Sequence, residues 1–540
     1  MSQCAMSKNG FSIFQSEVDT LLLQMNQDKI VDRIRKLDHT VWQPEPNEIT
    51  NRLGWLDIAN RLYSEIPNIN QFVQNVKADG FKQVLLLGMG GSSLAPELFA
   101  KTFGPNSDGL DVRVLDSTDP VMVLSCKEWI QKKKTLFIVS SKSGGTAETF
   151  SFFKYFYTMM KSELGDEAGN HFIVITDPGS KLEQISNELG FRKTFINDPN
   201  IGGRFSVLSY FGLIPAALTG LDIQKLVQSA IDADWSLAVE IGVFMGHLAL
   251  NGIDKLTFII SPQLQSFGDW VEQLIAESTG KHNKGILPVV GESLLSADQY
   301  GEDRFFIHLK LRSDSSNDAQ MAALADAGYP VLNLTLYNLY QLGEQFFIWE
   351  LATAVCGHLL KINPFDQPNV ESAKVAARTM INTYLENGSL PDPETATFSK
   401  DSLMRFLDLS QTGDYISIQA FIPMNTETMT TMQQIQESLQ KLTRLAVTVG
   451  FGPRFLHSTG QLHKGDRGNG LFIQLTCDAS KDIPIPNEPG DQQSDMSFHI
   501  LKTAQAMGDY QAIKNENRPV IHFHLSKNIG QALTELLAMI

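Results

Sequence analysis

Small hydroxyl residues and glycines gather in one loop, residues 140–149, which read SSKSGGTAET. The apolar run 136–139 before this loop predicts a buried strand, and the apolar spacing after it predicts a helix. Free backbone N–H groups and the dipole at a helix N-terminus favour an anion at such a junction. A simple helix cap would use only one or two hydroxyls, so the loop predicts an anion site. The loop offers four hydroxyls, those of Ser141, Ser143, Thr146 and Thr149.

A glycine-rich loop lies earlier in the chain. Residues 88–96 read GMGGSSLAP and follow another apolar run. Glycines let a backbone approach a ligand closely, and Pro96 suits the first turn of a helix. Two alternatives for this loop are a tight turn without a ligand and a dinucleotide site with Asp116 as its ribose-binding acid. The dinucleotide alternative is the weaker one, because Ser93 stands where the third glycine would be.

Three further stretches carry charged groups that could act on a bound anion. Arg204 follows two glycines, so its guanidinium could be held close to an oxyanion. Glu277 ends a predicted helix, where a carboxylate is electrostatically disfavoured, and this placement suggests a general base. Lys374 lies early in a helix that follows Pro368, on a side that could face a cleft. Each of these residues, taken alone, is better explained as an ordinary surface residue.

Charge and composition limit the class of protein. The chain has 540 residues and a formal net charge of −16 at pH 7. Because nothing in it is broadly basic, we expect neither nucleic acid nor a membrane surface as its partner, whereas a small phosphorylated ligand needs only a local site. The 4 cysteines lie far apart, residues 1–16 lack the apolar core of a signal peptide, and no apolar run is as long as a membrane span. We expect a cytoplasmic protein without a metal or redox cofactor.

These motifs are positioned by alternating strands and helices. Such alternation is typical of a parallel sheet covered on both faces. It covers two stretches of the chain, with apolar strands predicted at 84–87, 112–115, 136–139, 172–175, 256–260, 305–311 and 331–336. Helices are predicted at 320–327 and 344–360. We therefore predict an α/β fold with two doubly wound parallel-sheet domains and a C-terminal α/β or α+β region.

The predicted organisation has four parts. They are an N-terminal helical segment at 1–75, a first domain at 76–240, a second domain at 241–390 and the C-terminal region at 395–540. Trp42 and Trp55 are the expected packing anchors of the first part, and turn-forming residues after 388 mark the last boundary. The C-terminal region is predicted to start with a strand at 415–421 and to end with a strand at 520–525 and a short helix. The proline- and acid-rich residues 482–491 are expected to form an exposed loop.

Together these stretches resemble the phosphoglucose isomerase family over residues 80–380. The glycine loop is similar to the family's GIGGSxLGP stretch, with Ala95 in place of a glycine, and the hydroxyl loop is similar to its sugar-phosphate loop. Three more stretches are similar to its GGR, ESxGK and NxFDQ…K motifs. The resemblance implies two sugar-isomerase (SIS) domains. It also implies that Glu277 is the catalytic base, that Arg204 steadies an enediolate and that Lys374 acts on the sugar ring. The implied substrate and phosphate contacts are Gly90, Gly91, Ser92, Ser141, Lys142, Ser143, Thr146, Thr149 and Gln367.

The resemblance also implies a reaction. We expect interconversion of glucose 6-phosphate and fructose 6-phosphate through a cis-enediolate, in glycolysis and gluconeogenesis. One alternative is a dual enzyme that also isomerises mannose 6-phosphate. Another is a sugar-phosphate sensor without catalysis, which is disfavoured because the chain has no basic DNA-binding segment and keeps both Glu277 and Lys374.

A narrower resemblance concerns one branch of the family. Residues 39–42, 51–55 and 452–465 are similar to the isomerase half of transaldolase–isomerase fusion proteins. Because too few residues precede the first predicted sheet to form the transaldolase half, we expect a free-standing isomerase of this type or a fragment. Since the C-terminal region could replace a contribution that a neighbouring subunit makes in the family, we expect a monomer or a homodimer.

The chain departs from the family at one position. Gln341 and Glu344 stand where the family carries the histidine that opens the sugar ring. We hypothesise that His463, which follows a Gly-Gln pair, takes over this role, with His457 as the second candidate. The weaker candidates are His282 and His308.

Overall fold

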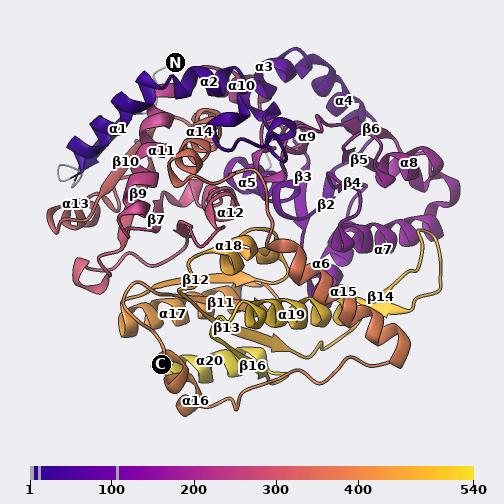
Figure 1. Cartoon of the computed structure of the whole chain (residues 1–540). Coiled ribbons are helices and arrows are strands. Elements are labelled where there is room, and N and C mark those ends of the chain that lie inside the picture. The colour runs from indigo at the N-terminus through magenta and orange to yellow at the C-terminus, as the bar shows by residue number, and fades with distance from the viewer. Residues whose placement is uncertain (1–4, 10–13, 105–108) are drawn as a thin grey trace.

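The structure is a computed structural model that describes residues 5–9, 14–104 and 109–540. The described residues form three mainly parallel sheets, two from the N-terminal part of the chain and one from the C-terminal part, and one short antiparallel pair of strands (Figure 1). The predicted α/β fold, with two doubly wound sheets and a further α/β region, is confirmed. The exact domain boundaries stay predictions.

The first sheet has the strand order β3-β2-β4-β5-β6, and all its neighbouring strands are parallel. Val84 and Leu86 belong to one hydrophobic cluster and Leu85 and Leu87 to another, so both faces of the sheet are covered. The strands are β2 (Gln83–Leu87), β3 (Asp111–Leu115), β4 (Thr135–Ser140), β5 (Phe172–Thr176) and β6 (Lys193–Ile196). The helices that follow them are α5 (Leu94–Phe103), α6 (Pro120–Ile130), α7 (Ala147–Leu164), α8 (Lys181–Glu188), α9 (Tyr210–Leu218), α10 (Ile223–Ile231) and α11 (Trp235–Leu250).

The second sheet repeats this plan with the order β1-β10-β9-β7-β8. Its side chains share one hydrophobic cluster with one face of the first sheet, so the two sheets are packed around a common core. The strands are β1 (Ala5–Asn9), β7 (Lys255–Ile260), β8 (Leu287–Val289), β9 (Arg304–Leu311) and β10 (Val331–Leu336), and the helices are α12 (Phe267–Thr279), α13 (Asp318–Asp326) and α14 (Leu342–Leu360).

The N-terminal segment differs from its prediction in one respect. Residues Ala5–Asn9 form a strand rather than a helix, and this strand pairs antiparallel with the edge strand β10. Edge pairing uses backbone groups, so it needs no apolar alternation in the sequence. The rest of the segment is largely helical, with α1 (Gln15–Gln27), α2 (Ile30–Arg35), α3 (Ile58–Tyr63) and α4 (Ile66–Ala78). Trp42 and Trp55 are buried, as predicted.

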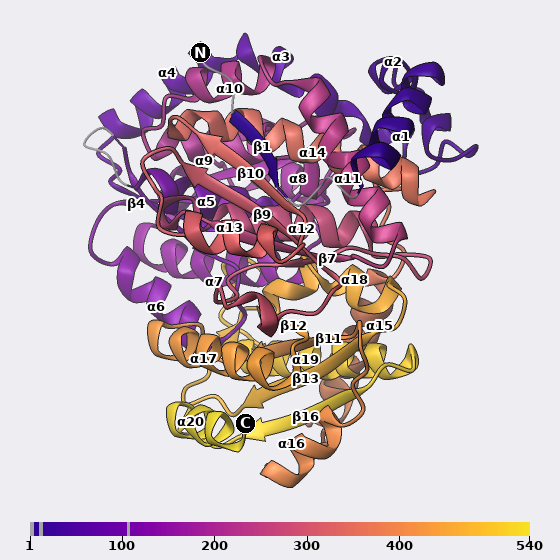
Figure 2. The same cartoon turned by 90° about the vertical axis from the view of Figure 1, so that its left-hand side faces the viewer.

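The C-terminal region forms the third parallel sheet, with the order β12-β11-β13-β16 and a hydrophobic core of its own. Both views place it beneath the two N-terminal sheets (Figures 1 and 2). Its strands are β11 (Tyr415–Phe421), β12 (Ala446–Phe451), β13 (Gly470–Cys477) and β16 (Val520–Leu525), with the short pair β14 (Pro484–Ile485) and β15 (Met496–Ser497). Its helices are α16 (Lys400–Leu407), α17 (Thr426–Thr443), α18 (Gly460–Gly465), α19 (Phe498–Asn515) and α20 (Ile529–Met539).

The prediction of an exposed loop at 482–491 is wrong in part. Ile483 and Ile485 are buried, and they join the hydrophobic cluster on the α7 face of the first sheet. Prolines and acids dominate the composition of this stretch, but its two isoleucines determine how it packs.

Helix α15 (Val370–Asn387) links the upper and lower parts of the molecule. It packs along α19 of the C-terminal region, although its residues precede the predicted boundary at 390 (Figure 1). It also brings residues at its N-terminal end toward the two N-terminal sheets. Among the described residues, no single helix is both long and apolar enough to cross a membrane, and the bent pair α10 and α11 alone meets the criteria of length and composition jointly.

Candidate active site

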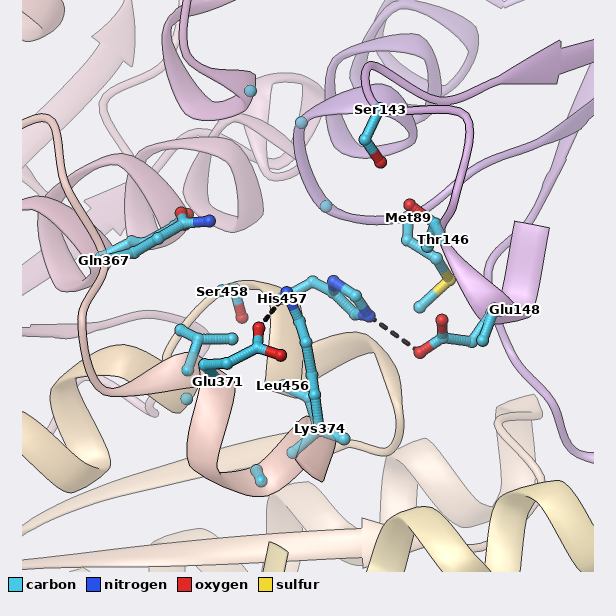
Figure 3. A pocket seen from close by; sticks show the side chains of 18 of the residues that line it. Met89, Ser143, Thr146, Glu148, Gln367, Glu371, Lys374, Leu456, His457 and Ser458 are labelled. Atoms are coloured by element: carbon cyan, nitrogen blue, oxygen red, sulfur yellow. Dashed lines mark hydrogen bonds and ion pairs between the residues drawn. The ribbon is translucent and has the colours of Figure 1, made fainter. Parts of the chain in front are cut away.

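A cavity of about 850 Å³ lies where the two N-terminal sheets meet the C-terminal region. Its walls come from both glycine-containing loops, from α12, from α15 and from the segment between β12 and β13 (Figure 3). All the predicted site residues line this cavity except Ser141, Thr149 and His463. The fold therefore brings together motifs that are up to 284 residues apart in the chain (Gly90 and Lys374).

The hydroxyl-rich loop presents two of its four hydroxyls to the cavity. Ser143 and Thr146 line it, and Thr146 is the N-cap residue of α7 (Figure 3). Gly144 has a φ of +69°, in the left-handed region that favours glycine, and it lets the chain turn between them. Backbone N–H groups at the start of α7 are thus available beside two hydroxyls, which is an arrangement that suits an anion.

The other two hydroxyls of the loop point elsewhere. Ser141 is buried, and its Oγ lies 3.1 Å from Thr146 Oγ1. Thr149 is buried in the first turn of α7. Neither residue lines the cavity, so this geometry does not bring either of them into direct contact with a phosphate bound there. Ser141 instead orients the hydroxyl of Thr146.

Lys142 lines the cavity, and its ammonium group is paired with a carboxyl group of the protein. Its Nζ forms an ion pair with Asp177 and donates a hydrogen bond to the carbonyl oxygen of Pro199 at 2.9 Å. Burial raises the pKa of Asp177. Asp177 follows β5, so this contact ties the hydroxyl-rich loop to the next strand of the sheet.

The glycines of the first loop allow it to lie against the Arg204 loop. A Cβ atom on Gly91 would be 2.0 Å from the carbonyl oxygen of Gly203, so a larger residue does not fit. Gly90 has a φ of +54° and lies against Gln273, whose Nε2 would be 3.0 Å from a Cβ at that position. These two glycines are needed for close backbone packing as well as for access to the cavity.

Arg204 joins three motifs at the centre of the site. Its Nη1 lies 3.2 Å from Glu277 Oε1 and donates to Gln367 Oε1 at 3.2 Å. Nε donates to Ser278 Oγ at 2.8 Å, and Nη2 donates to the carbonyl oxygens of Pro364 and Asp366 at 2.7 and 3.0 Å. Burial lowers the pKa of the Arg204 guanidinium, while the carboxylates of Glu277 and Asp366 oppose this effect. The guanidinium therefore fixes the proposed base and the Gln367 loop together.

Lys281 also binds the loop that carries Gln367. It is fully buried, and its Nζ donates to the carbonyl oxygen and to Oδ1 of Asp366 at 2.6 and 2.7 Å. Burial and the nearby charge of Arg204 lower the pKa of Lys281 to about 8.

Lys374 reaches the cavity from α15. Its Nζ lies 3.8 Å from Glu371 Oε2 on the same helix, and Figure 3 shows both side chains extending toward His457. The side chain of Lys374 remains 45% exposed. It is thus the least constrained cation among the predicted site residues.

His463 does not line the cavity, so the first hypothesis for the ring-opening histidine needs correction. Its ring is enclosed by aromatic side chains, with the ring centres of Phe472 and Phe455 at 5.1 and 6.1 Å. Burial lowers the pKa of His463 well below its usual range. The histidine lies on α18, which turns it toward the strands of the third sheet, so it acts as a core residue.

His457 is the histidine that faces the cavity. It ends the 3₁₀ turn η10 (Arg454–His457), and its Nε2 lies 2.8 Å from Glu148 Oε1 (Figure 3). Glu148 also accepts a hydrogen bond from Gln505 at 2.7 Å. Burial alone would raise the pKa of Glu148, but His457 and other neighbours together lower it below its ordinary value. A hydrogen-bonded carboxylate of this kind orients an imidazole for proton transfer.

A single amide connects this histidine to Glu277. Gln273 Nε2 donates to the carbonyl oxygen of His457 at 2.7 Å and to Glu277 Oε2 at 3.0 Å. Gln273 lies one helical turn before Glu277 on α12, so the spacing could have identified it. Other lining residues that sequence reasoning left without a role are Arg52, Glu148, Asp177 and Glu371.

Within the described part of the chain, no group of three or more His, Cys, Asp or Glu side chains is arranged to hold a metal ion. Asp116, the residue that a dinucleotide would require for its ribose, is instead bound by Arg454 at 2.7 Å.

Comparison with known proteins supports the resemblance of these loops to the motifs of phosphoglucose isomerase. Residues 61–283 match the family model described as Phosphoglucose isomerase. This stretch contains the two glycine loops, Arg204 and Glu277, while Gln367, Lys374 and His457 lie beyond it.

Relatives that match about two thirds of this chain agree with the family model. A protein of Methanococcus maripaludis named probable glucose-6-phosphate isomerase is 28% identical over 382 residues, which cover 62% of this chain and 85% of that protein. A glucose-6-phosphate isomerase of Campylobacter jejuni is 28% identical over 429 residues, covering 70% of this chain and 100% of that protein. A solved structure of a hypothetical protein from Thermus thermophilus has a TM-score of 0.61 at 24% identity, covering 70% of this chain and 100% of that one, and shows the same fold.

Proposed function

We propose that this chain interconverts glucose 6-phosphate and fructose 6-phosphate, because residues 61–283 match the phosphoglucose isomerase model. The observation that carries this proposal is one cavity in which the Glu277 carboxylate, the Arg204 guanidinium and the hydroxyl-rich loop all meet. An anion site and a buried base beside a cation are the groups that an aldose–ketose isomerase needs.

The substrate phosphate is assigned to the hydroxyl-rich loop. Ser143 and Thr146, with the backbone N–H groups that begin α7, bind the phosphate oxygens. Gly90, Gly91 and Ser92 form the neighbouring wall and contact the sugar. Holding the phosphate end fixes the reacting carbons in front of the base.

Ring opening is assigned to His457. The C1–O5 bond breaks, the ring oxygen receives a proton and the C1 hydroxyl gives one up, so that no net proton is consumed. His457 donates the proton to the ring oxygen, and Glu148 holds its imidazole in place at 2.8 Å. Lys374, which reaches the same space, stabilises the oxygen atoms of the ring as charge develops.

Isomerisation is assigned to Glu277. Its carboxylate removes the C2 proton of the open-chain aldose, and the electron pair forms the double bond of a cis-enediolate. The hydroxyl proton of O2 passes to O1, and the same carboxylate returns the C2 proton to C1 as O2 becomes the ketone oxygen. Arg204 lies 3.2 Å from the carboxylate and stabilises the oxyanion, and Gln367 is held by Arg204 beside it.

Two finer features belong to the same proposal. The C-terminal region of the same chain supplies His457 to the cavity, and we propose a monomer or a homodimer as the active unit. The expected location is the cytoplasm, where sugar phosphates occur.

A coupled assay tests the function and the base together. Conversion of fructose 6-phosphate is measured by NADP-linked oxidation of the glucose 6-phosphate formed, in the wild type and in Glu277→Gln. We expect wild-type turnover and a loss of at least about 100-fold in Glu277→Gln, as for removal of a general base. Turnover unaffected by the substitution contradicts the assigned base. Binding of fructose 6-phosphate without any wild-type turnover contradicts an isomerase and favours a sugar-phosphate sensor.

A further inference from the structure

The turn η10 carries His457 but is too short to fix its own position. It has four residues and lies between β12 and α18. A 3₁₀ turn of this length has little stability of its own, because few hydrogen bonds offset the ordering of its backbone. Its place in the molecule is therefore set by the contacts of its side chains.

Arg454, the first residue of the turn, is bound to the first sheet. Its Nε lies 2.7 Å from Asp116 Oδ2, just after β3, and its Nη2 forms an ion pair with Glu97 on α5. Glu97 is also paired with Lys101 at 2.8 Å. Although burial opposes ionisation, Arg454 and Lys101 lower the pKa of Glu97 to about 2. The guanidinium thus bridges two carboxyl groups of the first domain.

The geometry of the turn couples Arg454 to His457. Residues three apart on a 3₁₀ turn project from the same side. Accordingly, both Arg454 and His457 contact the first domain, since His457 pairs with Glu148 on α7. Phe455 points the other way, into the C-terminal region, where its ring lies 5.5 Å from Phe421. Side chains of the turn therefore contact both the first domain and the C-terminal region.

We propose that Arg454 is a positioning residue for ring opening, because its two ion pairs set the place of η10 and so hold His457 against Glu148. This inference rests on the proposed function. Arginine suits the task because its planar fork can engage two carboxylates at once, which a lysine does less well.

The surroundings of Arg454 indicate what its loss would do. Besides pairing with Glu97 and Asp116, the charge of Arg454 acts to lower the pKa values of Asp269 and Glu272 on α12, against the effect of their burial. Glu272 also accepts a hydrogen bond from Ser458 at 3.3 Å, directly after the turn. Without the guanidinium, Glu97 and Asp116 would lose the cation that ties this short segment to the first domain. The turn would then shift, and a displacement of about 1 Å at a reacting group can cost about 100-fold in rate.

Ring opening can be measured apart from isomerisation. Exchange between the α and β anomers of glucose 6-phosphate requires C1–O5 cleavage but no removal of the C2 proton. We therefore measure anomer exchange by NMR in Glu277→Gln, which blocks isomerisation. In this background we expect Arg454→Met to lower exchange about 10-fold to 100-fold, and Arg454→Lys to lower it less.

Lys502→Met is the matched control. Lys502 forms a buried ion pair with Asp119 at 2.8 Å, which also joins the C-terminal region to the first domain but does not hold η10. This control should leave anomer exchange within about twofold of its parent. An equal loss in Arg454→Met and Lys502→Met would overturn the proposal, since it would indicate a general effect on the interface.

A double-mutant cycle separates positioning from general support. If Arg454 acts through His457, Arg454→Met should cause no further loss of exchange in His457→Gln, whereas independent effects multiply. Multiplying effects overturn the proposal. Should Arg454→Met fail to fold, Arg454→Lys carries the same cycle. A wild type without exchange or isomerisation refutes the proposed function, whereas an active wild type with an unaffected Arg454→Met refutes this inference alone.

Discussion

Replacing Arg204 by methionine provides a severe test of how the site is assembled. The side chain makes five polar contacts, which join Glu277, Ser278, Gln367 and two backbone carbonyls. At 3.2 Å and an effective dielectric constant of about 20, the attraction between Arg204 and Glu277 is about 5 kcal/mol. Desolvation offsets part of this, and breaking one side of a buried pair costs about 3–5 kcal/mol.

This cost translates into a measurable loss of stability. An unfolding entropy of about 2.1 cal/mol/K per residue gives about 1.1 kcal/mol/K for 540 residues. A loss of about 4 kcal/mol then lowers the melting temperature by about 3–4 °C if the whole chain unfolds as one unit. The loss is larger if the N-terminal sheets unfold separately from the C-terminal region.

The catalytic loss should be larger than the structural one suggests. Removing a single group that stabilises an oxyanion lowers kcat about 100-fold to 1000-fold. Arg204→Lys keeps the positive charge but loses the planar set of N–H donors of the guanidinium. We therefore expect its kcat to lie between those of the wild type and Arg204→Met, with a loss of stability similar to that of Arg204→Met. The coupled assay, with the melting curve of each variant, measures both. A folded Arg204→Met that keeps kcat within about threefold of the wild type would refute the assigned role of the guanidinium.

Three further predictions concern residues around the site. Gly91→Ala should lower kcat/KM or destabilise the fold by about 1–3 kcal/mol, because its Cβ would lie 2.0 Å from the Gly203 carbonyl oxygen. Gly203→Ala is the control and should be tolerated, because a Cβ there meets open space. Equal effects of the two substitutions would contradict this packing. His463→Asn should change turnover less than about threefold, since it lies outside the cavity, and a loss of about 100-fold or more would restore it as a catalytic acid. Burial and the neighbouring charge of Asp269 raise the pKa of Glu272 to about 8. Its stabilising contribution is therefore complete below the unfolded pKa of about 4.3 and is lost as the pH rises through about 8, so melting temperatures measured from pH 5 to pH 9 should fall less steeply in Glu272→Gln; parallel curves would contradict the shift.

The fold was largely predictable because its strands are continuous apolar runs. The runs at 136–139 and 172–175 are buried on both faces, so their composition identifies them without knowledge of the tertiary structure. β1 was missed because Ala5–Asn9 pairs through its backbone and carries no apolar pattern. The same limit applies to α15, whose packing partner, α19, lies more than a hundred residues away.

The site was predictable where glycines or charged motifs are adjacent in sequence to a strand or helix end. Glu277 and Arg204 are of this kind. The choice between His457 and His463 was not, because both lie in one short segment and their directions depend on contacts with different sheets. Lys142 shows a similar limit, since Asp177, which engages its charge, comes from the following strand of the sheet.

The position of α15 has a consequence for how the chain could be divided. Residues 388–399, which follow this helix, form neither helix nor strand and are largely exposed, so a protease would reach them easily. A cut there would leave α15 covalently attached to the N-terminal fragment while it remains packed along α19 of the other fragment. Lys374 would then belong to the N-terminal fragment and His457 to the C-terminal fragment. The two halves, produced separately, should therefore recover isomerase activity only on mixing, which would make this enzyme a natural split reporter of molecular proximity.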